Sequence, residues 1–367
     1  MQDRLTRLAD VLVHYSLAVS PGQLVRIKAP AIALPLVERV YRAVLTSGGH
    51  PYYTAEQEQL REALLRHGSE KQIAYVSELE RREVGCIDAM ITIGAPENTK
   101  FLSTVAPERL ALERSSRQEQ FKTMLARMAS GEVAWVGTVY PVPALAQDAE
   151  LSLEEFAAFY DQACFLDCPD PVEAWQSLSR RQAAMIERLT PVKHLHLKAP
   201  GTDLQLEVTG RRWINCDGKR NFPDGEVFTG PLETSAEGVI SFSFPACYLG
   251  KEVEGVRLTF KDGKVREATA TKHQDYLERM LALDEGASRI GELAFGTNER
   301  VTRFCRNILF DEKIGGTMHL ALGASLPESG GLNHSALHWD MVCDLRRGGE
   351  VWADGTLLVR DGTFLLS

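Results

Sequence analysis

The hydrophobic positions in the first third of the chain alternate between helical and strand spacing. Leu5, Leu8 and Leu12 recur on one face of a helix, residues 20–22 break the chain, and residues 24–28 follow the pattern of a strand. The later elements that the pattern predicts are a helix at 37–44, a short strand near Tyr52, and buried strands at 89–93 and 133–139. The pattern therefore predicts an N-terminal α/β layer domain.

The spacing changes after two predicted helices in the middle of the chain. Ser152 and Glu155 match a capping box that opens the first helix, and the second helix ends at Thr190-Pro191. Alternating segments then predict β-hairpins at residues 194–208 and from residue 256 onward. We expect two domains, an α/β domain at 1–190 and a mixed, strand-rich α+β domain at 191–367.

The charge and cysteine content exclude several classes of partner. The chain has 50 acidic and 41 basic residues, and its basic residues are scattered, which disfavours binding to a phosphate backbone. The first residues are charged and no apolar run approaches the roughly 18 residues of a membrane span, so we expect neither a signal peptide nor a membrane segment. Seven cysteines without a C-x-x-C pair are typical of reduced thiols. We expect a cytoplasmic protein that binds neither nucleic acid nor membrane.

Carboxylates and histidines carry the candidate chemistry, because the sequence contains no common nucleotide, serine-hydrolase or H-E-x-x-H zinc motif. His338 and Asp340 lie two apart in a predicted strand and project from one face, whereas a turn at 223–225 would present Glu226 from a loop. Two histidines and three carboxylates suffice for two divalent ions if one carboxylate bridges them, and such donors suit zinc, cobalt or manganese. The spacing alone leaves open that these are surface or satisfied core groups. The candidates are Glu226, Glu292, His319, His338 and Asp340.

Four motifs that contain these candidates resemble, in order, the motifs of the aminopeptidase T family of thermophilic metalloproteases. They are Asn221-Phe-Pro-Asp-Gly-Glu-Val-Phe-Thr229, Arg289-Ile-Gly-Glu292 with Gly296-Thr-Asn298, Asp311-Glu-Lys313 with His319-Leu-Ala-Leu-Gly323, and Asn333-His-Ser335 with His338-Trp-Asp340. The resemblance extends over essentially the whole chain, since residues 20–23 and 40–41 fit the family's N-terminal domain. The motifs that make the resemblance specific lie between Asn221 and Asp340.

The resemblance implies that all five candidates are metal ligands and hold two adjacent divalent ions of zinc, cobalt or manganese. It also implies a metallo-aminopeptidase, a cytoplasmic homodimer that hydrolyses the first peptide bond of peptides with a free N-terminus. The expected chemistry is attack by a water that the two ions make nucleophilic. A carboxylate near the site, Glu292 or Glu312, is the candidate general base, although Asp311-Glu-Lys313 by itself is typical of a solvated turn.

One position departs from the family pattern. The family continues after this Gly323 to a Ser-Tyr-Pro whose tyrosine is regarded as catalytic, whereas this chain has Ser325-Leu326-Pro327. Leucine has no hydroxyl, so the loss of that donor would lower turnover by roughly 10²–10³, by analogy with removal of one oxyanion-hole donor. The hydroxyls of Tyr248 and Ser325 are candidates to replace it.

Two alternatives to a working aminopeptidase stay open. In the first, the metal site is kept, but peptidase activity is weakened, lost or redirected to another amide because of Leu326. In the second, the chain is a non-catalytic, oligomeric interaction protein whose glutamates and histidines bind no divalent ion.

Overall fold

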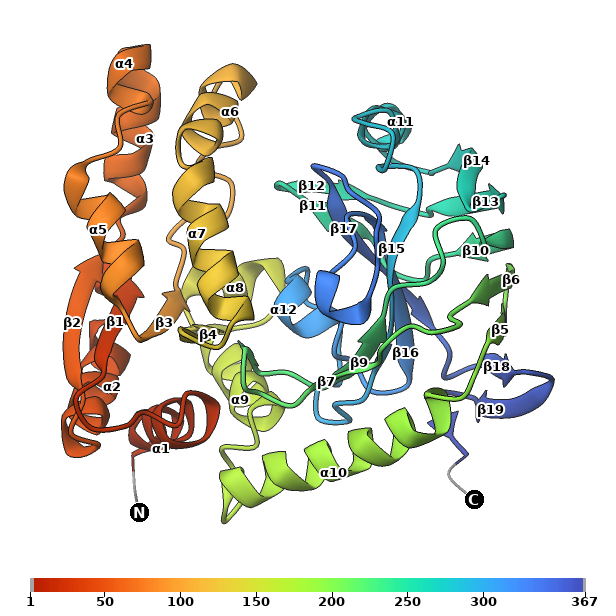
Figure 1. Ribbon diagram of the computed structural model, residues 1–367, viewed down its shortest axis with the longest axis horizontal. Coiled ribbons are helices and arrows are strands. Elements are labelled where there is room, and N and C mark those ends of the chain that lie inside the picture. Colours follow the sequence, from red (N-terminus) through yellow and green to blue (C-terminus); the bar gives the residue numbers. More distant parts are fainter. Residues whose placement is uncertain (1–2, 366–367) are drawn as a thin grey trace. The chain divides into compact units, whose positions relative to one another are not determined.

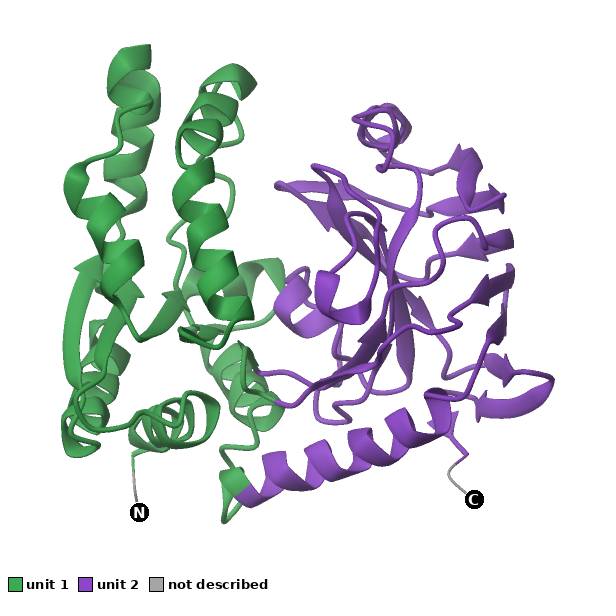
Figure 2. Ribbon diagram, viewed as in Figure 1, with its two compact units in different colours: residues 1–172, 218–222 green, residues 173–217, 223–367 purple. Residues whose placement is uncertain are grey.

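The structure, a computed structural model, describes residues 3–365 and contains two compact units (Figure 2). Unit 1 contains Met1–Val172 and Gly218–Phe222, and unit 2 contains Glu173–Asp217 and Pro223–Ser367. The expected boundary at residues 190–191 therefore falls within unit 2. As a boundary between independently folding domains, it stays a prediction.

Unit 1 is built on a parallel β-sheet with the strand order β2-β1-β3-β4-β8 (Figure 1). In β1 the alternate residues Val25, Ile27 and Ala29 are buried, which is the periodicity of a strand. The sequence-based strands at 24–28, 89–93 and 133–139 are thus confirmed. The strands are β1 (Leu24–Ala29), β2 (His50–Ala55), β3 (Ala89–Gly94), β4 (Ala134–Val139) and β8 (Asn221–Phe222).

Helix α9 of unit 1 begins at the capping box that the sequence predicts. The backbone N–H of Glu155 donates to the Ser152 hydroxyl, and the Glu155 carboxylate accepts from the Ser152 N–H, which confirms the capping box. Helix α10 (Pro171–Leu189) starts at the last residues of unit 1 and continues in unit 2. The other helices of unit 1 are α1 (Arg4–Asp10), the π-helix η1 (Val11–Ser16), the 3₁₀ helix η2 (Ala31–Ala33), α2 (Leu34–Thr46), α3 (Glu58–His67), α4 (Glu70–Ile73), α5 (Glu78–Cys86), α6 (Pro107–Ser116), α7 (Gln118–Ala129), α8 (Pro143–Asp148) and α9 (Leu153–Ala163).

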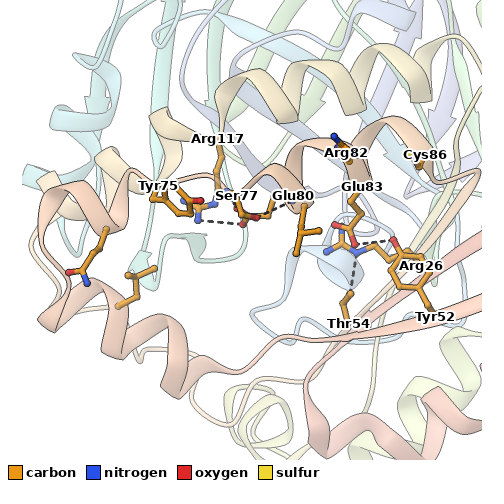
Figure 3. A pocket seen from close by; sticks show the side chains of 13 residues that line it. Arg26, Tyr52, Thr54, Tyr75, Ser77, Glu80, Arg82, Glu83, Cys86 and Arg117 are labelled. Carbon is orange, nitrogen blue, oxygen red and sulfur yellow. Dashed lines mark hydrogen bonds and ion pairs between the residues drawn. The ribbon is translucent and has the colours of Figure 1, made fainter.

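A cavity of about 830 Å³ in unit 1 is lined by paired charges (Figure 3). Arg26 donates to the Thr54 hydroxyl and lies 3.0 Å from the Glu83 carboxylate, and Tyr52 donates its hydroxyl hydrogen to the same carboxylate at 2.9 Å. Burial and the Glu83 carboxylate raise the pKa of Tyr52, so its hydroxyl stays a donor at neutral pH. These contacts tie helix α5 to strands β1 and β2, which is a structural role.

Unit 2 is strand-rich and antiparallel. Its larger sheet has the order β14-β13-β10-β6-β5-β18-β19-β20, and a five-stranded sheet has the order β17-β16-β15-β9-β7. The hairpins expected at 194–208 and from residue 256 are confirmed as β5–β6 and β13–β14. The strands are β5 (His194–Ala199), β6 (Thr202–Glu207), β7 (Ile214–Cys216), β9 (Glu226–Thr229), β10 (Glu237–Ser241), β11 (Ala246–Tyr248), β12 (Lys251–Val253), β13 (Arg257–Lys261), β14 (Lys264–Thr269), β15 (Ile290–Gly296), β16 (Thr317–Gly323), β17 (His338–Asp344), β18 (Glu350–Ala353), β19 (Thr356–Arg360) and β20 (Thr363–Phe364).

One face of the five-stranded sheet belongs to the hydrophobic core of unit 2. Leu293 pairs with Leu320 and Phe295 pairs with Met318, and all four are buried in a core that also contains residues of the eight-stranded sheet. Because side chains alternate along a strand, every second residue of β15, β16 and β17 points away from this core. The shorter helices of unit 2 are α11 (Gln274–Leu281), α12 (Ile308–Asp311) and the 3₁₀ helix η3 (Pro327–Ser329).

A β-bulge at Gly291 changes which residues of β15 face the core. Ile290 pairs with Leu322 but Glu292 pairs with Ala321, so two steps on β15 match one step on β16. Ile290 remains in the core, whereas Glu292 points to the opposite face. Leu293 and Phe295 also face the core, so the extra residue allows Ile290 to join them while Glu292 stays on the opposite face.

The architecture agrees with the fold class expected from sequence, a parallel α/β sheet region followed by a strand-rich region. Within residues 3–365, each helix is too short or too polar to span a bilayer.

The bulge generates a stability prediction. In Gly291→Ala, the added Cβ would collide with the carbonyl oxygens of Gly323 and Ala324, so we expect a loss of about 1–3 kcal/mol in the free energy of unfolding. Urea denaturation monitored by circular dichroism measures this change.

Gly85→Ala is the matched control, because Gly85 lies in helix α5 and a Cβ there meets nothing within 4 Å. We expect this variant to be as stable as the parent or more stable by up to ~1 kcal/mol, from helix propensity. Equal stability of the two variants would contradict the role assigned to the bulge.

Candidate metal centre

The register of the five-stranded sheet brings the candidate residues to the face opposite the core. Residues that pair across antiparallel strands share a face. Ala321 pairs with Glu292 on one side and with Asp340 on the other, so the two carboxylates flank a small side chain. His319 lies two residues before Ala321 and therefore shares this face.

Glu226 and His338 lie on the same face of the sheet, and each pairs with a glycine on the neighbouring strand. Glu226 pairs with Gly296, and His338 pairs with Gly323, so neither long side chain meets a bulky cross-strand neighbour. The expectation that a loop presents Glu226 is wrong, because Glu226 is the first residue of strand β9. Pairing with Gly296 on β15 extends the strand back to the end of the predicted turn.

The imidazole of His319 lies among three carboxylates. Its Nε2 is 3.4 Å from Glu226 Oε2, 3.6 Å from Glu292 Oε1 and 4.0 Å from Asp340 Oδ1. The side chain is fully buried. Donors from four strands, which are separated in the sequence, thus meet at one point.

His338 faces the other side of the same cluster. Its Nε2 is 3.4 Å from Glu292 Oε2 and 3.6 Å from Asp340 Oδ1. Its Nδ1 lies 2.9 Å from the Ala324 carbonyl oxygen, so Nδ1–H donates there and Nε2 is directed at the carboxylates. The side chain is 33% exposed, which makes this part of the site reachable from solvent.

The donor atoms have the environment and spacing of ion ligands. Within residues 3–365, Glu226 Oε2, His319 Nε2 and Asp340 Oδ1 are buried without a hydrogen-bond partner, which is costly unless another group binds them. Two donors that bind one ion at about 2.0–2.2 Å in tetrahedral geometry lie about 3.3–3.6 Å apart. The closest imidazole–carboxylate separations, 3.4–3.6 Å, match that spacing. The residues present therefore fit a divalent ion.

A buried lysine offsets part of the negative charge of the centre. Lys313 is fully buried, and its Nζ lies 2.6 Å from Glu226 Oε1, 2.6 Å from Glu312 Oε1 and 3.5 Å from Asp224 Oδ1. The expectation of a solvated turn at residues 311–313 is wrong. The apolar residues on either side of this segment, at 308–310 and 314, are the signal in the sequence that indicates burial.

The described residues that could hold an ion form three groups in unit 2, two of which share Glu226. Glu312 lies in the group with Glu226 and His319, so the structure brings this general-base candidate to the site. The second group contains the other three candidates from the sequence. The groups are Glu226–Glu312–His319, Glu292–His338–Asp340 and Cys216–Asp224–Glu226.

Helix α10 supports the site through a residue that sequence reasoning missed. Gln182 is fully buried, and its Nε2 lies 2.7 Å from the Glu226 carbonyl oxygen, 3.1 Å from that of Cys216 and 3.0 Å from the Thr297 hydroxyl. These contacts fix the start of β9. A lone amide on the apolar face of the helix is the only sequence signal for this role.

Burial and mutual attraction shift the titration of the cluster. Burial favours the neutral imidazoles, but neighbouring carboxylates outweigh it and raise the pKa of His319 to about 9 and that of His338 to about 10. Burial also opposes ionisation of Glu292, but the two imidazoles lower its pKa to about 2. Burial raises the pKa of Asp340 to about 6 and raises that of Glu226, which Lys313 and His319 partly oppose. Without an ion, two protonated imidazoles balance part of the carboxylate charge.

The sequence model of a protein family described as thermophilic metalloprotease (M29) matches residues 1–364. The chain belongs to this family. An ion-binding arrangement is what a metalloprotease requires, and the resemblance of the sequence motifs is thereby confirmed.

Curated members of the family and a solved structure resemble the chain over nearly its full length. Aminopeptidase 2 of Geobacillus stearothermophilus is 29% identical, with 93% of this chain and 92% of that protein covered. Aminopeptidase T of Thermus thermophilus is 28% identical, with 98% and 95% covered. The structure of wild-type AmpT from Thermus thermophilus aligns with a TM-score of 0.86 at 24% identity over 99% of both chains, which shows a common fold.

Metal uptake should release protons. An imidazole binds an ion only when neutral, and the pKa values of about 9 and about 10 mean that His319 and His338 are both protonated at pH 7 in protein stripped of metal. We expect the release of about two protons per chain at pH 7, and an apparent affinity that rises with pH until both imidazoles are neutral. Isothermal titration calorimetry in buffers of different ionisation enthalpy measures the number.

The His338→Gln variant is the control for this measurement, since it lacks one of the two imidazoles. We expect it to release about one proton fewer. An affinity independent of pH between 6 and 9 would contradict the assignment of the imidazoles as ligands.

Proposed function

We propose that the protein is a metal-dependent aminopeptidase that hydrolyses the first peptide bond of peptides with a free N-terminus. The observation that carries the proposal is the set of bare, buried donor atoms of Glu226, His319 and Asp340 at ion-binding spacing. Membership of a metalloprotease family and full-length similarity to proteins named aminopeptidases support the reaction class.

The proposed centre would hold two divalent ions. Glu226 and His319 would hold one ion, and His338 and Asp340 would hold the other. Glu292 would help to hold both, because its Oε1 faces His319 and its Oε2 faces His338. Zinc, cobalt and manganese suit these carboxylate and imidazole donors.

The formal charge of the centre supports the number of ions. With neutral imidazoles, five carboxylates and one ammonium carry a formal charge of −4, which two divalent cations balance. A single divalent ion would leave two negative charges in a buried site, which is costly. The charged groups are Asp224, Glu226, Glu292, Glu312, Asp340 and Lys313.

The side chains of the protein orient the groups of the site and transfer protons. Bound ions would supply Lewis acidity, which polarises the scissile carbonyl and activates water. The hydrogen bond to Ala324 holds His338 in one orientation. Of the two general-base candidates, Glu292 has both oxygens facing imidazoles, whereas Glu312 is 12% exposed and has one oxygen on Lys313. We therefore assign proton transfer to Glu312.

We favour Ser325 over Tyr248 as the source of the hydroxyl that would replace the family tyrosine. The Tyr248 ring packs on Trp339 with ring centroids 5.7 Å apart, and Trp339 belongs to the core face of β17, opposite the carboxylates. Ser325 stays a candidate, because it follows Ala324, the residue that orients His338. Leu326 lies next in this loop.

A second candidate function rests on Leu326. A chain that keeps the metal donors but lacks the tyrosine hydroxyl is also suited to weakened peptidase activity or to cleavage of another amide. We further propose that the protein is a cytoplasmic homodimer. The family resemblance supports the dimer, and seven free cysteines fit a reducing compartment.

A panel of short peptides tests the proposed function. Protein stripped of metal and reloaded with zinc, cobalt or manganese should release the first residue of free peptides and leave N-acetylated ones intact. Mass spectrometry identifies the released residue, and Glu292→Gln is the inactive control. Equal cleavage of acetylated peptides would contradict an aminopeptidase, and no cleavage with any metal would favour the second candidate function.

The Leu326→Tyr variant tests the role of the missing hydroxyl. We expect kcat to rise by up to roughly 10²-fold if the parent is a weakened peptidase, since one oxyanion donor is regained. Leu326→Phe is the matched control, because it adds the ring without the hydroxyl. Equal rates for the two variants would indicate a redirected substrate.

A further inference from the structure

Lys313 has no place in the ligand set, yet it is in direct contact with it. Its fully buried ammonium lies 2.6 Å from one oxygen of Glu226 and 2.6 Å from one oxygen of Glu312, and Asp224 lies at 3.5 Å. An ammonium group has three N–H donors. Lys313 donates a hydrogen bond to Glu312 and forms ion pairs with Glu226 and Asp224.

We propose that Lys313 is a positioning residue that holds Glu312 away from metal coordination. An ion held by Glu226 and His319 would then keep one coordination position free for substrate. This inference rests on the proposed function, because it concerns the ions of that site. It goes further by assigning a task to a residue outside the ligand set.

The contacts of the two glutamates differ in the way this proposal requires. Glu226 has Oε1 on Lys313, and its other oxygen is buried, bare and 3.4 Å from His319 Nε2. Glu312 lies close enough to join the same ion, since donor atoms of the three residues lie within 4.8 Å of one another. Its Oε1, however, accepts a hydrogen bond from Lys313, whereas Lys313 and Glu226 form an ion pair without a hydrogen bond. Glu226 is thus arranged as a ligand, and Glu312 is restrained by a competing charge-assisted hydrogen bond.

Cation affinity alone does not explain a lysine here. A fixed positive charge beside a cation site repels the cation, so Lys313 weakens binding at the ions that the enzyme needs. Catalytic zinc sites characteristically keep one position open, whereas structural sites are closed by protein ligands. Restraint of Glu312 accounts for both the contact and its electrostatic cost.

Lys313→Met removes the charge and leaves an unbranched side chain. We expect divalent cations to bind at least about tenfold more tightly, because the repulsion is lost and Glu312 is released to the ion. We also expect kcat to fall, because Glu312 fills the open position. Competition with a chromophoric chelator measures the affinity, and visible absorption of the cobalt-loaded protein should weaken as the coordination number rises.

The Lys313→Met/Glu312→Gln double variant is the matched control. It lacks the charge but also lacks the carboxylate that would fill the position, so the cobalt absorption should return to that of the parent. Weaker metal binding by Lys313→Met, or the loss of one ion per chain, would overturn the proposal and make Lys313 a structural support for the ligands.

Glu312→Gln alone keeps the proposal testable if the Lys313 variants do not fold. With Lys313 intact, we expect metal affinity within about threefold of the parent and an unchanged cobalt spectrum, because Glu312 is not a ligand. A loss of tenfold or more, or a changed spectrum, would identify Glu312 as a ligand and overturn the inference. These readouts need no peptide cleavage, so a failure of the proposed activity is recognised separately in the peptide assay.

Discussion

The alternation of side chains across the five-stranded sheet is the constraint on which the site depends. One face of β15, β16 and β17 carries Leu293, Leu320 and Met341 into the core of unit 2, and the other face carries the candidate ligands. Burial of the first face stabilises the strands in one register, because a slip by one residue would exchange the two faces. The precision of the site therefore derives from the packing behind it.

The cost of this arrangement is the concentration of buried negative charge. Carboxylates from β9, β15 and β17 lie close together. The basic groups that they contact are Lys313, His319 and His338. Lys313 and the imidazoles offset part of this charge, and divalent ions would offset the rest. The same electrostatics would hold ions in place and make the site unsuited to an apolar ligand.

Leu326 is the residue on which the choice between the two candidate functions depends. The five candidate metal ligands lie on strands, whereas Leu326 lies in the loop after β16. A strand residue is restrained by its register, but a loop residue can change without loss of the fold. A change of function at residue 326 would therefore leave the sheet, the ligands and the family match intact.

The sequence by itself determined the α/β and strand-rich regions, the capping box at Ser152 and the strand that contains His338 and Asp340, because hydrophobic spacing and local hydrogen bonding are encoded within a few residues. The tertiary structure decided what depends on partners far along the chain. Pairing with Gly296 makes Glu226 a strand residue, and the bulge at Gly291 allows Ile290 to face the core while Glu292 faces the site. The carboxylates of Asp224 and Glu226, which are far away in sequence, pair with the buried Lys313. Register and burial are set by cross-strand neighbours, and a local sequence pattern does not predict which strands will pair.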